Sequence, residues 1–229
     1  MLSRPAFRSR FSCARRTRTS FARWSASILW SRERSGACAC VFVVTGPSGA
    51  GKGTLIKGLL ERVPGLEVAV SATTRAQRPG EIDGHDYWFL SDEEFTRRVE
   101  AGEFLEYVPY VSRKRYGTLR SEMERIADDG RICVLELELE GALAVQAEVT
   151  GSITLFIAAD VPELERRLRG RATESTGEIG ERIALARAQL EQAHRFRYMV
   201  RNDDLERATA ALAAIVECEV AWSRKSAIR

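Results

Sequence analysis

The 229-residue sequence predicts an α/β protein in which a parallel sheet is flanked by helices on both faces. Short apolar runs alternate along the chain with stretches of helical spacing, as strands and helices do in such folds. A glycine-rich loop, GPSGAGKG at residues 46–53, joins the first apolar run to the first helical stretch. Residues 71–118 depart from this rhythm with short strands and turns, which indicates an inserted subdomain. Ligands of these folds bind beyond the carboxyl ends of the strands, so we expect a site there.

The first elements surround the glycine-rich loop. The apolar run Val41–Thr45 predicts a buried parallel strand. Apolar residues from Leu55 to Val63 fall on one helical face, and Pro64-Gly65 ends that helix. Residues 66–71 alternate as a strand that leads into the insertion.

Two sets of cap residues predict where later helices begin. Ser91 and Glu94 form a capping box that opens a helix ending near Gly102, after a short strand at 87–90. Asp160 and Glu163 form a second box, with Pro162 in the first turn. The remaining predicted elements are strands at 104–111, 132–137, 153–158 and 198–201, and helices at 121–129, 141–149, 181–195 and 203–222.

Charge is distributed unevenly along the chain. Residues 1–40 carry a net charge of +8, and the rest of the chain carries −5, which gives +3 in total. Because the globular part has no basic excess, we expect no nucleic-acid partner. No apolar run approaches the 18 residues that a membrane helix requires, so we expect a soluble protein with no membrane partner. The five cysteines lack zinc-ligand spacing and indicate reduced thiols in an intracellular protein.

The segment 1–40 is rich in Arg and Ser and poor in acidic residues, a composition typical of an organelle transit peptide. The alternative is a start-site extension of a bacterial reading frame, which we favour. On either interpretation we expect a disordered, catalytically idle segment. The expected location is therefore the cytoplasm, or an organelle if the segment is a transit peptide.

Two anion-binding patterns carry the chemistry. The loop at 46–53 turns backbone N–H groups inward, Lys52 adds a mobile positive charge, and the following helix adds its positive end. About 20 residues later, in the segment SATTRAQRPGE (71–81), Arg75 and Arg78 stand beside hydroxyl groups. Guanidinium groups bind phosphate through paired hydrogen bonds, so this segment suits a second phosphate. A chain that holds two phosphate-bearing ligands is expected to move a phosphoryl group between them.

The chain resembles the guanylate kinases, a family of P-loop nucleoside monophosphate kinases, from about residue 41 to residue 220. The motifs that carry the resemblance are GPSGAGKGT, SATTRAQRPGE with DGHDYWF, EFLE, RYGT, LRGR and RNDDLE. It implies one domain at 41–222 and a tail at 223–229. Within the domain it implies a core (41–70, 119–165 and 186–222), a GMP-binding insertion (71–118) and a lid (about 166–185).

The resemblance implies a set of ATP-binding residues, namely Gly46, Pro47, Ser48, Gly49, Ala50, Gly51, Lys52, Gly53, Thr54 and Asn202. Asn202 matches a residue near the adenine in relatives, and capping the last helix is an equal alternative. Gly53 stands where many phosphate loops have a magnesium-binding hydroxyl. Mg²⁺ is the expected cofactor, held largely by phosphates and water, and no protein ligand to it is assigned.

The implied GMP-binding residues are Ser71, Arg75, Arg78, Tyr87, Glu106, Tyr116, Thr118 and Glu138. Glu106 would select guanine, because one carboxylate can accept from both the N1–H and the N2 amino group of that base. The alternative is a surface glutamate on an exposed strand. Glu138 stands one methylene longer than the aspartate that the family often has, and its place is near the base or the metal.

The resemblance implies transfer of the γ-phosphoryl group of ATP to GMP or dGMP, with Lys52, Arg75, Arg171 and Arg182 as catalytic residues. Arg167 and Arg169 lie nearby and could equally form a solvated helix face. Alternatives are an inactive scaffold module of the same fold, or a kinase with another acceptor such as ribose bisphosphate. The expected partners are therefore small molecules, and the chain is expected to be a monomer or a homodimer.

Overall fold

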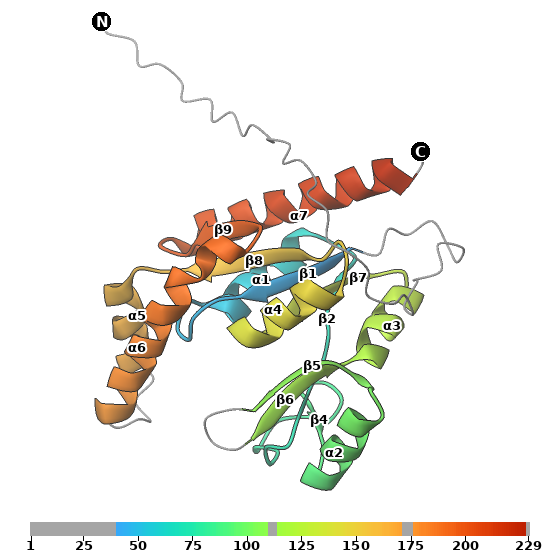
Figure 1. The fold of residues 1–229 in the computed structure, drawn as a ribbon. Helices are drawn as coiled ribbons and strands as arrows, with labels where there is room; N and C mark the ends of the chain where they lie inside the picture. The colour runs from blue at the N-terminus through green and yellow to red at the C-terminus, as the bar shows by residue number, and fades with distance from the viewer. Residues whose placement is uncertain (1–39, 110–113, 171–175, 228–229) are drawn as a thin grey trace, which may run out of the picture. The chain divides into compact units, whose positions relative to one another are not determined.

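The computed structural model of the protein describes residues 40–109, 114–170 and 176–227. The segment 1–39 and the predicted catalytic residue Arg171 lie outside the described residues. Figure 1 shows the arrangement of the described elements.

A five-stranded parallel sheet forms the centre of the protein and confirms the predicted fold class. Its strands, in spatial order, are β2 (Leu66–Val68), β7 (Ile132–Glu136), β1 (Val41–Thr45), β8 (Ile153–Ala158) and β9 (Tyr198–Arg201). All four neighbouring pairs run parallel. β1 therefore lies in the middle, and its carboxyl end opens directly into the glycine-rich loop.

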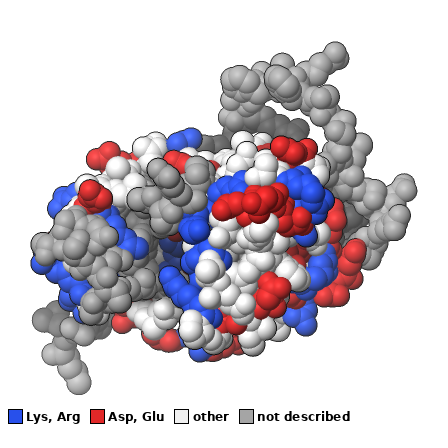
Figure 2. Space-filling view, turned by 90° about the horizontal axis from the view of Figure 1, so that it is seen from below, with Lys and Arg blue, Asp and Glu red and all other residues white. Residues whose placement is uncertain are grey.

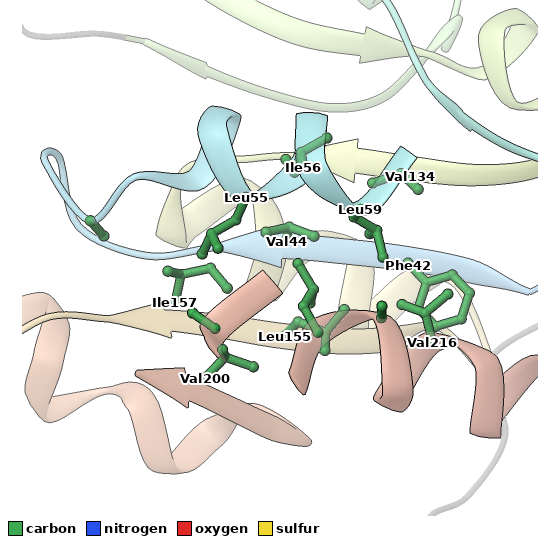
Figure 3. Packing of buried hydrophobic residues seen from close by; sticks show 14 of the residues in the cluster. Phe42, Val44, Leu55, Ile56, Leu59, Val134, Leu155, Ile157, Val200 and Val216 are labelled. Carbon is green, nitrogen blue, oxygen red and sulfur yellow. The ribbon is translucent and has the colours of Figure 1, made fainter. Parts of the chain in front are cut away.

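Helices cover both faces of this sheet because successive residues of its strands point to opposite sides. Phe42 and Val44 pack in one core cluster with α1 (Lys52–Arg62) and α7 (Leu205–Ala227), as Figure 3 shows. Val41 and Val43 pack in a second cluster on the other face, with α3 (Arg120–Asp128) and α4 (Leu139–Glu148). α5 (Val161–Arg169) and α6 (Thr176–Glu191) join the first cluster through Leu164 and Ala186.

The residues that follow β2 and precede α3 in the sequence form a second sheet. Its spatial order is β4 (Trp88–Phe89), β3 (Ser71–Thr73), β6 (Arg115–Leu119) and β5 (Phe104–Pro109). The helix α2 (Asp92–Glu100) covers it through Phe95, which is fully buried against Ala72, Phe104 and Leu119. The second sheet thus has its own small core.

Two predictions on this sheet need correction. The single strand expected at 66–71 is two strands in different sheets, so Ala69 and Val70 carry the chain from one sheet to the other. The strand β6 was not predicted, because RYGTL has little apolar character and its place depends on pairing with β3 and β5. A side chain at Gly117 would meet the carbonyl oxygen of Glu106 at 2.6 Å, so only glycine fits this tight crossing.

The Ser91 cap is confirmed, although the Glu94 carboxylate binds Arg97 and Arg98 and does not complete the predicted box. The second predicted cap is wrong. The Ser91 hydroxyl accepts a hydrogen bond of 3.1 Å from the Glu94 backbone N–H at the start of α2. Asp160 precedes α5 but makes no side-chain cap, since its carboxylate binds the Arg201 guanidinium at 2.8 and 2.9 Å. Glu163 binds Arg166 and Arg167 instead of completing a box. A charged partner offers a stronger hydrogen bond than a backbone amide, which explains the difference.

The boundaries of the last two helices also differ. The helix predicted at 181–195 begins earlier as α6 and ends in a separate 3-10 turn, Ala193–Arg195. The last helix begins at Leu205 and continues beyond residue 222. Among the described helices, none is both long enough and apolar enough to cross a bilayer.

Candidate active site

A cleft of about 710 Å³ opens where the carboxyl ends of β1 and β7 face the second sheet. The glycine-rich loop and Lys52 line it from the first sheet, while Arg78, Tyr87 and Glu106 line it from the second. Lys and Arg side chains gather along a hollow near the middle of the face in Figure 2, whereas basic and acidic atoms alternate elsewhere on that face. The two anion-binding patterns of the sequence therefore meet in one cavity.

The glycine-rich loop owes its shape to glycines that no other residue can replace. Gly46 has a φ of 148°, and a side chain there would lie 2.2 Å from the Ile157 carbonyl oxygen on β8. Gly51 is left-handed at the start of α1, with a φ of 86°, and a side chain there would lie 2.5 Å from the Asn202 amide. The loop is thus pressed against β8 and Asn202, with its other side open to the cleft.

Two side chains brace the loop from behind. The buried Asn202 donates from Nδ2 to the Ala50 carbonyl at 2.7 Å. Arg167 donates to the carbonyl oxygens of Gly49 and Ala50, both at 3.3 Å, and to that of Asn202 at 3.0 Å. These bonds turn the carbonyl groups of Gly49 and Ala50 to the back of the loop. Backbone N–H groups are what such a loop offers to an anion. α7 is capped by Asp204, which accepts from the Arg207 N–H at 2.8 Å, and not by Asn202.

Lys52 lies at the first turn of α1, where its side chain is 10% exposed. It donates to the Gly46 carbonyl at 2.7 Å and lies 3.9 Å from the Glu138 carboxylate. Both contacts keep the charge inside the cleft beside the loop.

Two carboxylates at the end of β7 face the same space. Glu136 and Glu138 both line the cleft, and a side chain at Gly53 would lie 3.7 Å from Glu136. The side chain of Glu136 is accessible to solvent, yet the surrounding walls of the cleft desolvate it and raise its pKa, an effect that the Lys52 charge opposes. A cation bound here would stabilise the ionised carboxylate and so offset the cost of its desolvation.

Glu106 lies at the opposite side of the cleft and is only 7% exposed. A β-bulge between Phe104 and Glu106 sets its direction. Phe104 enters the core of the second sheet, Leu105 enters the core of the first, and Glu106 turns toward the cleft. Burial raises the pKa of Glu106, and hydrogen bonds from the side chain and backbone of Thr118 act in the opposite direction. Ser71 pairs with Thr118 across β3 and β6, next to this carboxylate.

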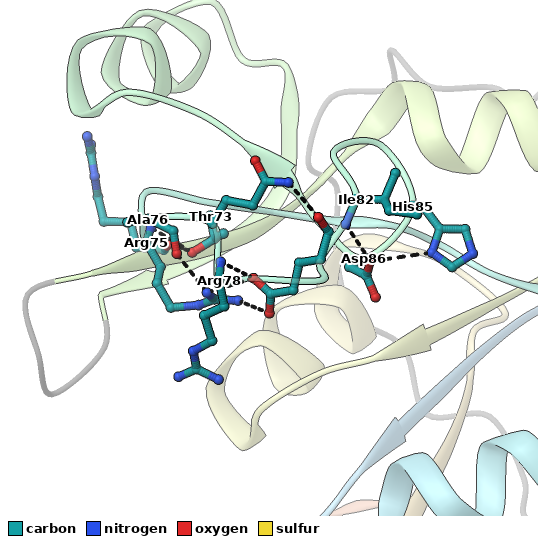
Figure 4. Close-up of polar contacts among 10 residues, drawn as sticks. Thr73, Arg75, Ala76, Arg78, Ile82, His85 and Asp86 are labelled. Carbon is teal, nitrogen blue, oxygen red and sulfur yellow. Dashed lines mark hydrogen bonds and ion pairs between the residues drawn. The ribbon is translucent and has the colours of Figure 1, made fainter.

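Arg75 is held by partners within the second sheet and its loops (Figure 4). Its guanidinium binds Glu81 through two hydrogen bonds, of 2.9 and 2.8 Å. Its Cζ atom lies 5.2 Å from the ring centre of Tyr87, and it also interacts with the Tyr116 hydroxyl. Tyr87 and Tyr116 line the cleft, so Arg75 lies immediately behind its wall.

Most predicted site residues are brought together by the structure. Those that line the cleft are Pro47, Ser48, Gly49, Gly51, Lys52, Gly53, Thr54, Ser71, Arg78, Tyr87, Glu106, Tyr116, Glu138 and Arg182. From α6, the Arg182 guanidinium lies 3.4 Å from the Ser48 hydroxyl of the loop. Gly46, Ala50, Arg75, Thr118 and Asn202 contact lining residues from behind.

Among the residues that the structure places in or beside the site, Glu81, Glu136 and Arg167 are polar groups to which the sequence analysis assigned no definite role. Glu81 stands in the arginine segment, and Glu136 ends a buried strand two residues before Glu138, which was the available signal. The sequence left open whether Arg167 belongs to the site or to a solvated helix face. Its hydrogen bonds to the carbonyl oxygens of Gly49 and Ala50 show that it braces the loop.

Comparison with known proteins agrees with this geometry. A family model described as guanylate kinase matches residues 39–219. The guanylate kinase of Rubrobacter xylanophilus is 44% identical over 182 residues, which cover 79% of this chain and 95% of that protein. That of Symbiobacterium thermophilum is 41% identical over 182 residues, which cover 79% and 86%. The crystal structure of guanylate kinase from Anaplasma phagocytophilum superimposes with a TM-score of 0.64 at 28% identity, covering 80% of this chain and 87% of that one. Because the family model spans most of the chain and the relatives align over nearly their whole length, this chain belongs to the guanylate kinase family.

Proposed function

We propose that the protein transfers the γ-phosphoryl group of ATP to GMP, giving ADP and GDP. The observation that carries the proposal is the shared cavity, lined by the phosphate loop with Lys52 on one side and by the buried Glu106 on the other. The relatives are named for this activity, which supports the same conclusion. The product serves the recycling of guanine nucleotides, and dGMP is a possible second acceptor.

Glu106 selects the base in this proposal. An ionised carboxylate accepts from the adjacent N1–H and N2 donors of guanine, whereas adenine offers an acceptor at N1 and would be repelled. Its burial and raised pKa mean that the carboxylate is costly to ionise without such donors. Ser71 and Thr118 supply further polar groups to the base.

Transfer itself needs positioning and charge neutralisation more than covalent chemistry. A phosphate oxygen of GMP attacks the γ-phosphorus in line, a new P–O bond forms, and the bond to the bridging oxygen of ADP breaks. The attacking oxygen is already ionised at neutral pH, so no residue has to remove a proton. Lys52 and Arg182 neutralise charge on the donor side, and Arg75, Arg78, Tyr87 and Tyr116 hold the acceptor phosphate. We also assign Arg171 to the donor side.

Magnesium fits the donor set of the cleft. Mg²⁺ keeps several of its waters and binds through substrate phosphates with one or two carboxylates. Glu136 and Glu138 are the carboxylates that would complete its shell, directly or through water. When bound, Mg²⁺ supplies charge neutralisation for the triphosphate.

We propose the domain organisation given by the resemblance, with the second sheet as the GMP-binding part and residues 166–185 as a lid. Closure over both nucleotides would exclude water, which otherwise competes as the acceptor. Two nucleotides are the only partners the proposal requires, in a cytoplasmic monomer or homodimer that binds neither nucleic acid nor membrane.

Turnover on a panel of acceptors tests the proposal. The purified chain should form ADP from ATP in the presence of GMP, and far more slowly with AMP, UMP or ribose bisphosphate. Lys52→Ala is the matched inactive variant, because its missing charge should lower kcat by about a thousandfold while GMP binding persists. No ADP with any acceptor would indicate a scaffold module, and equal rates with AMP and GMP would remove Glu106 as the base-reading residue.

A further inference from the structure

Glu81 holds one edge of the Arg75 guanidinium. Arg75 donates from Nη1 to Oε2 of Glu81 at 2.9 Å and from Nη2 to Oε1 at 2.8 Å, and the two side chains are 14% and 20% exposed. Oε2 also accepts from the Arg78 backbone N–H at 2.8 Å. One carboxylate therefore fixes both the side chain of Arg75 and the backbone of Arg78, through the hydrogen bonds drawn in Figure 4.

The pairing occupies a defined part of the guanidinium. A guanidinium has five N–H donors, arranged as an end fork (Nη1 and Nη2) and a side fork (Nε and Nη2). Glu81 takes the end fork, and the second Nη1 proton goes to the Ala76 carbonyl at 2.7 Å. The guanidinium also bonds the hydroxyl of Tyr116, which lines the cleft and belongs to the expected phosphate-binding set. The rings of Tyr87 and Phe89 lie 5.2 and 5.6 Å from Cζ and restrict the side chain further.

We infer that Glu81 is a positioning residue, which holds Arg75 by its end fork so that the side fork is preset for the phosphate of the acceptor nucleotide. This inference rests on the proposed function. Without Glu81 the long Arg75 side chain would have to be ordered by the ligand itself, and ordering a flexible group on binding weakens affinity. The carboxylate also repels an approaching phosphate. The inference therefore requires that the gain from ordering exceeds this repulsion.

The test compares a ligand that has the phosphate with one that lacks it. In the full chain, Glu81→Gln should raise the Kd of GMP at least about tenfold and leave that of guanosine within about twofold, by titration calorimetry. Glu81→Asp, which keeps the charge on a shorter side chain, should fall between wild type and Glu81→Gln. Glu94→Gln is the matched control, because Glu94 also holds an arginine of the same subdomain, Arg97, through bonds of 2.9 and 2.7 Å, away from the cleft.

A double-mutant cycle shows whether Glu81 acts through Arg75. In an Arg75→Met background, Glu81→Gln should have no further effect on the Kd of GMP. The inference is overturned if Glu81→Gln weakens guanosine as much as GMP, or if GMP binds equally well or more tightly. Wild-type GMP binding and ADP formation are separate arms of the experiment. Their failure would remove the proposed function, whereas the variants alone decide the role of Glu81.

Discussion

The Thr118 hydroxyl donates a hydrogen bond of 3.0 Å to Oε1 of Glu106, and both side chains are buried. The other carboxylate oxygen faces the first turn of α4, where a side chain at Gly141 would lie 2.5 Å from it. A hydroxyl from β6 and a bare backbone position on α4 therefore fix the orientation of the carboxylate that reads the base in our proposal.

The first prediction concerns this carboxylate. Glu106→Gln replaces one acceptor oxygen by an amide donor, which would face a donor of guanine. We expect kcat/KM for GMP to fall roughly a hundredfold, as happens when a buried polar contact is mispaired, with the KM for ATP nearly unchanged. Steady-state kinetics with each substrate varied in turn measures both. Glu103→Gln, at a partly exposed glutamate three residues earlier that pairs with Arg98, serves as the control. Equal losses for both nucleotides would contradict the base-reading role.

Local signals explain which elements could be predicted from the sequence. The strand β1, the glycine-rich loop and the start of α1 depend on neighbours in the chain, through an apolar run, glycines and helical spacing. The Ser91 cap is equally local, since its bond reaches only three residues ahead. These predictions are confirmed by the structure.

Contacts between distant residues explain the rest. β6 exists because β3 and β5 pair with its two edges, and RYGTL alone carries no strand signal. Asp160 fails as a cap because Arg201, 41 residues later, takes its carboxylate. For the same reason the sequence could not predict the partner of Asn202, because its amide bonds the carbonyl of Ala50, 152 residues earlier. Motifs therefore identified most residues of the site, whereas the long-range pairings that hold these residues in place could not be predicted from the sequence.

The second prediction separates stability from specificity at Gly141. Alanine has a better helix propensity than glycine, so Gly141→Ala should leave the free energy of unfolding unchanged or raise it by up to about 1 kcal/mol. Its added methyl group must displace the Glu106 carboxylate, so the KM for GMP should rise about tenfold or more. Urea unfolding and steady-state kinetics measure the two effects. Gly180→Ala, in α6 where a side chain meets open space, controls for general effects of helical glycine replacement. An unchanged KM for GMP would show that Glu106 can move without loss of function.

The third prediction concerns Glu122, a buried carboxylate where the chain passes between the two sheets. It accepts from the Val70 backbone N–H at 3.1 Å, from the Trp88 indole at 3.3 Å and from Arg125 at 3.1 and 3.3 Å. Burial opposes its charge, but the bonds from Arg125 and Val70 outweigh this effect and lower its pKa. Glu122→Gln should lower the free energy of unfolding at pH 7 by about 2–4 kcal/mol, since it breaks a buried charged network.

The pH dependence of this loss tests its electrostatic origin. A carboxyl group whose pKa is lowered on folding stabilises the native state above its unfolded pKa, and that contribution disappears as the pH falls through the native pKa. The difference between wild type and Glu122→Gln should therefore be constant from pH 7 to about 5 and shrink as the pH falls below about 4.5. Denaturant titrations across this range measure it. A difference independent of pH would indicate lost packing and not lost charge.

The last prediction follows from the opposite shift at Glu106. Its pKa is raised by burial, so the native state favours the neutral form, and ionisation near neutral pH destabilises the fold. Glu106→Gln removes that penalty and keeps an oxygen for the Thr118 hydroxyl. Without nucleotide, the variant should therefore be more stable than wild type at pH 7, and the two should converge as the pH falls below the unfolded pKa. Thermal unfolding at several pH values measures the difference, and added GMP should stabilise the wild type more than the variant, since in our proposal the carboxylate that costs stability is the one that binds the base. A variant less stable than wild type at neutral pH would show instead that hydrogen bonds within the folded protein stabilise the charged form of Glu106. Binding of guanine would then offset no desolvation cost at this carboxylate.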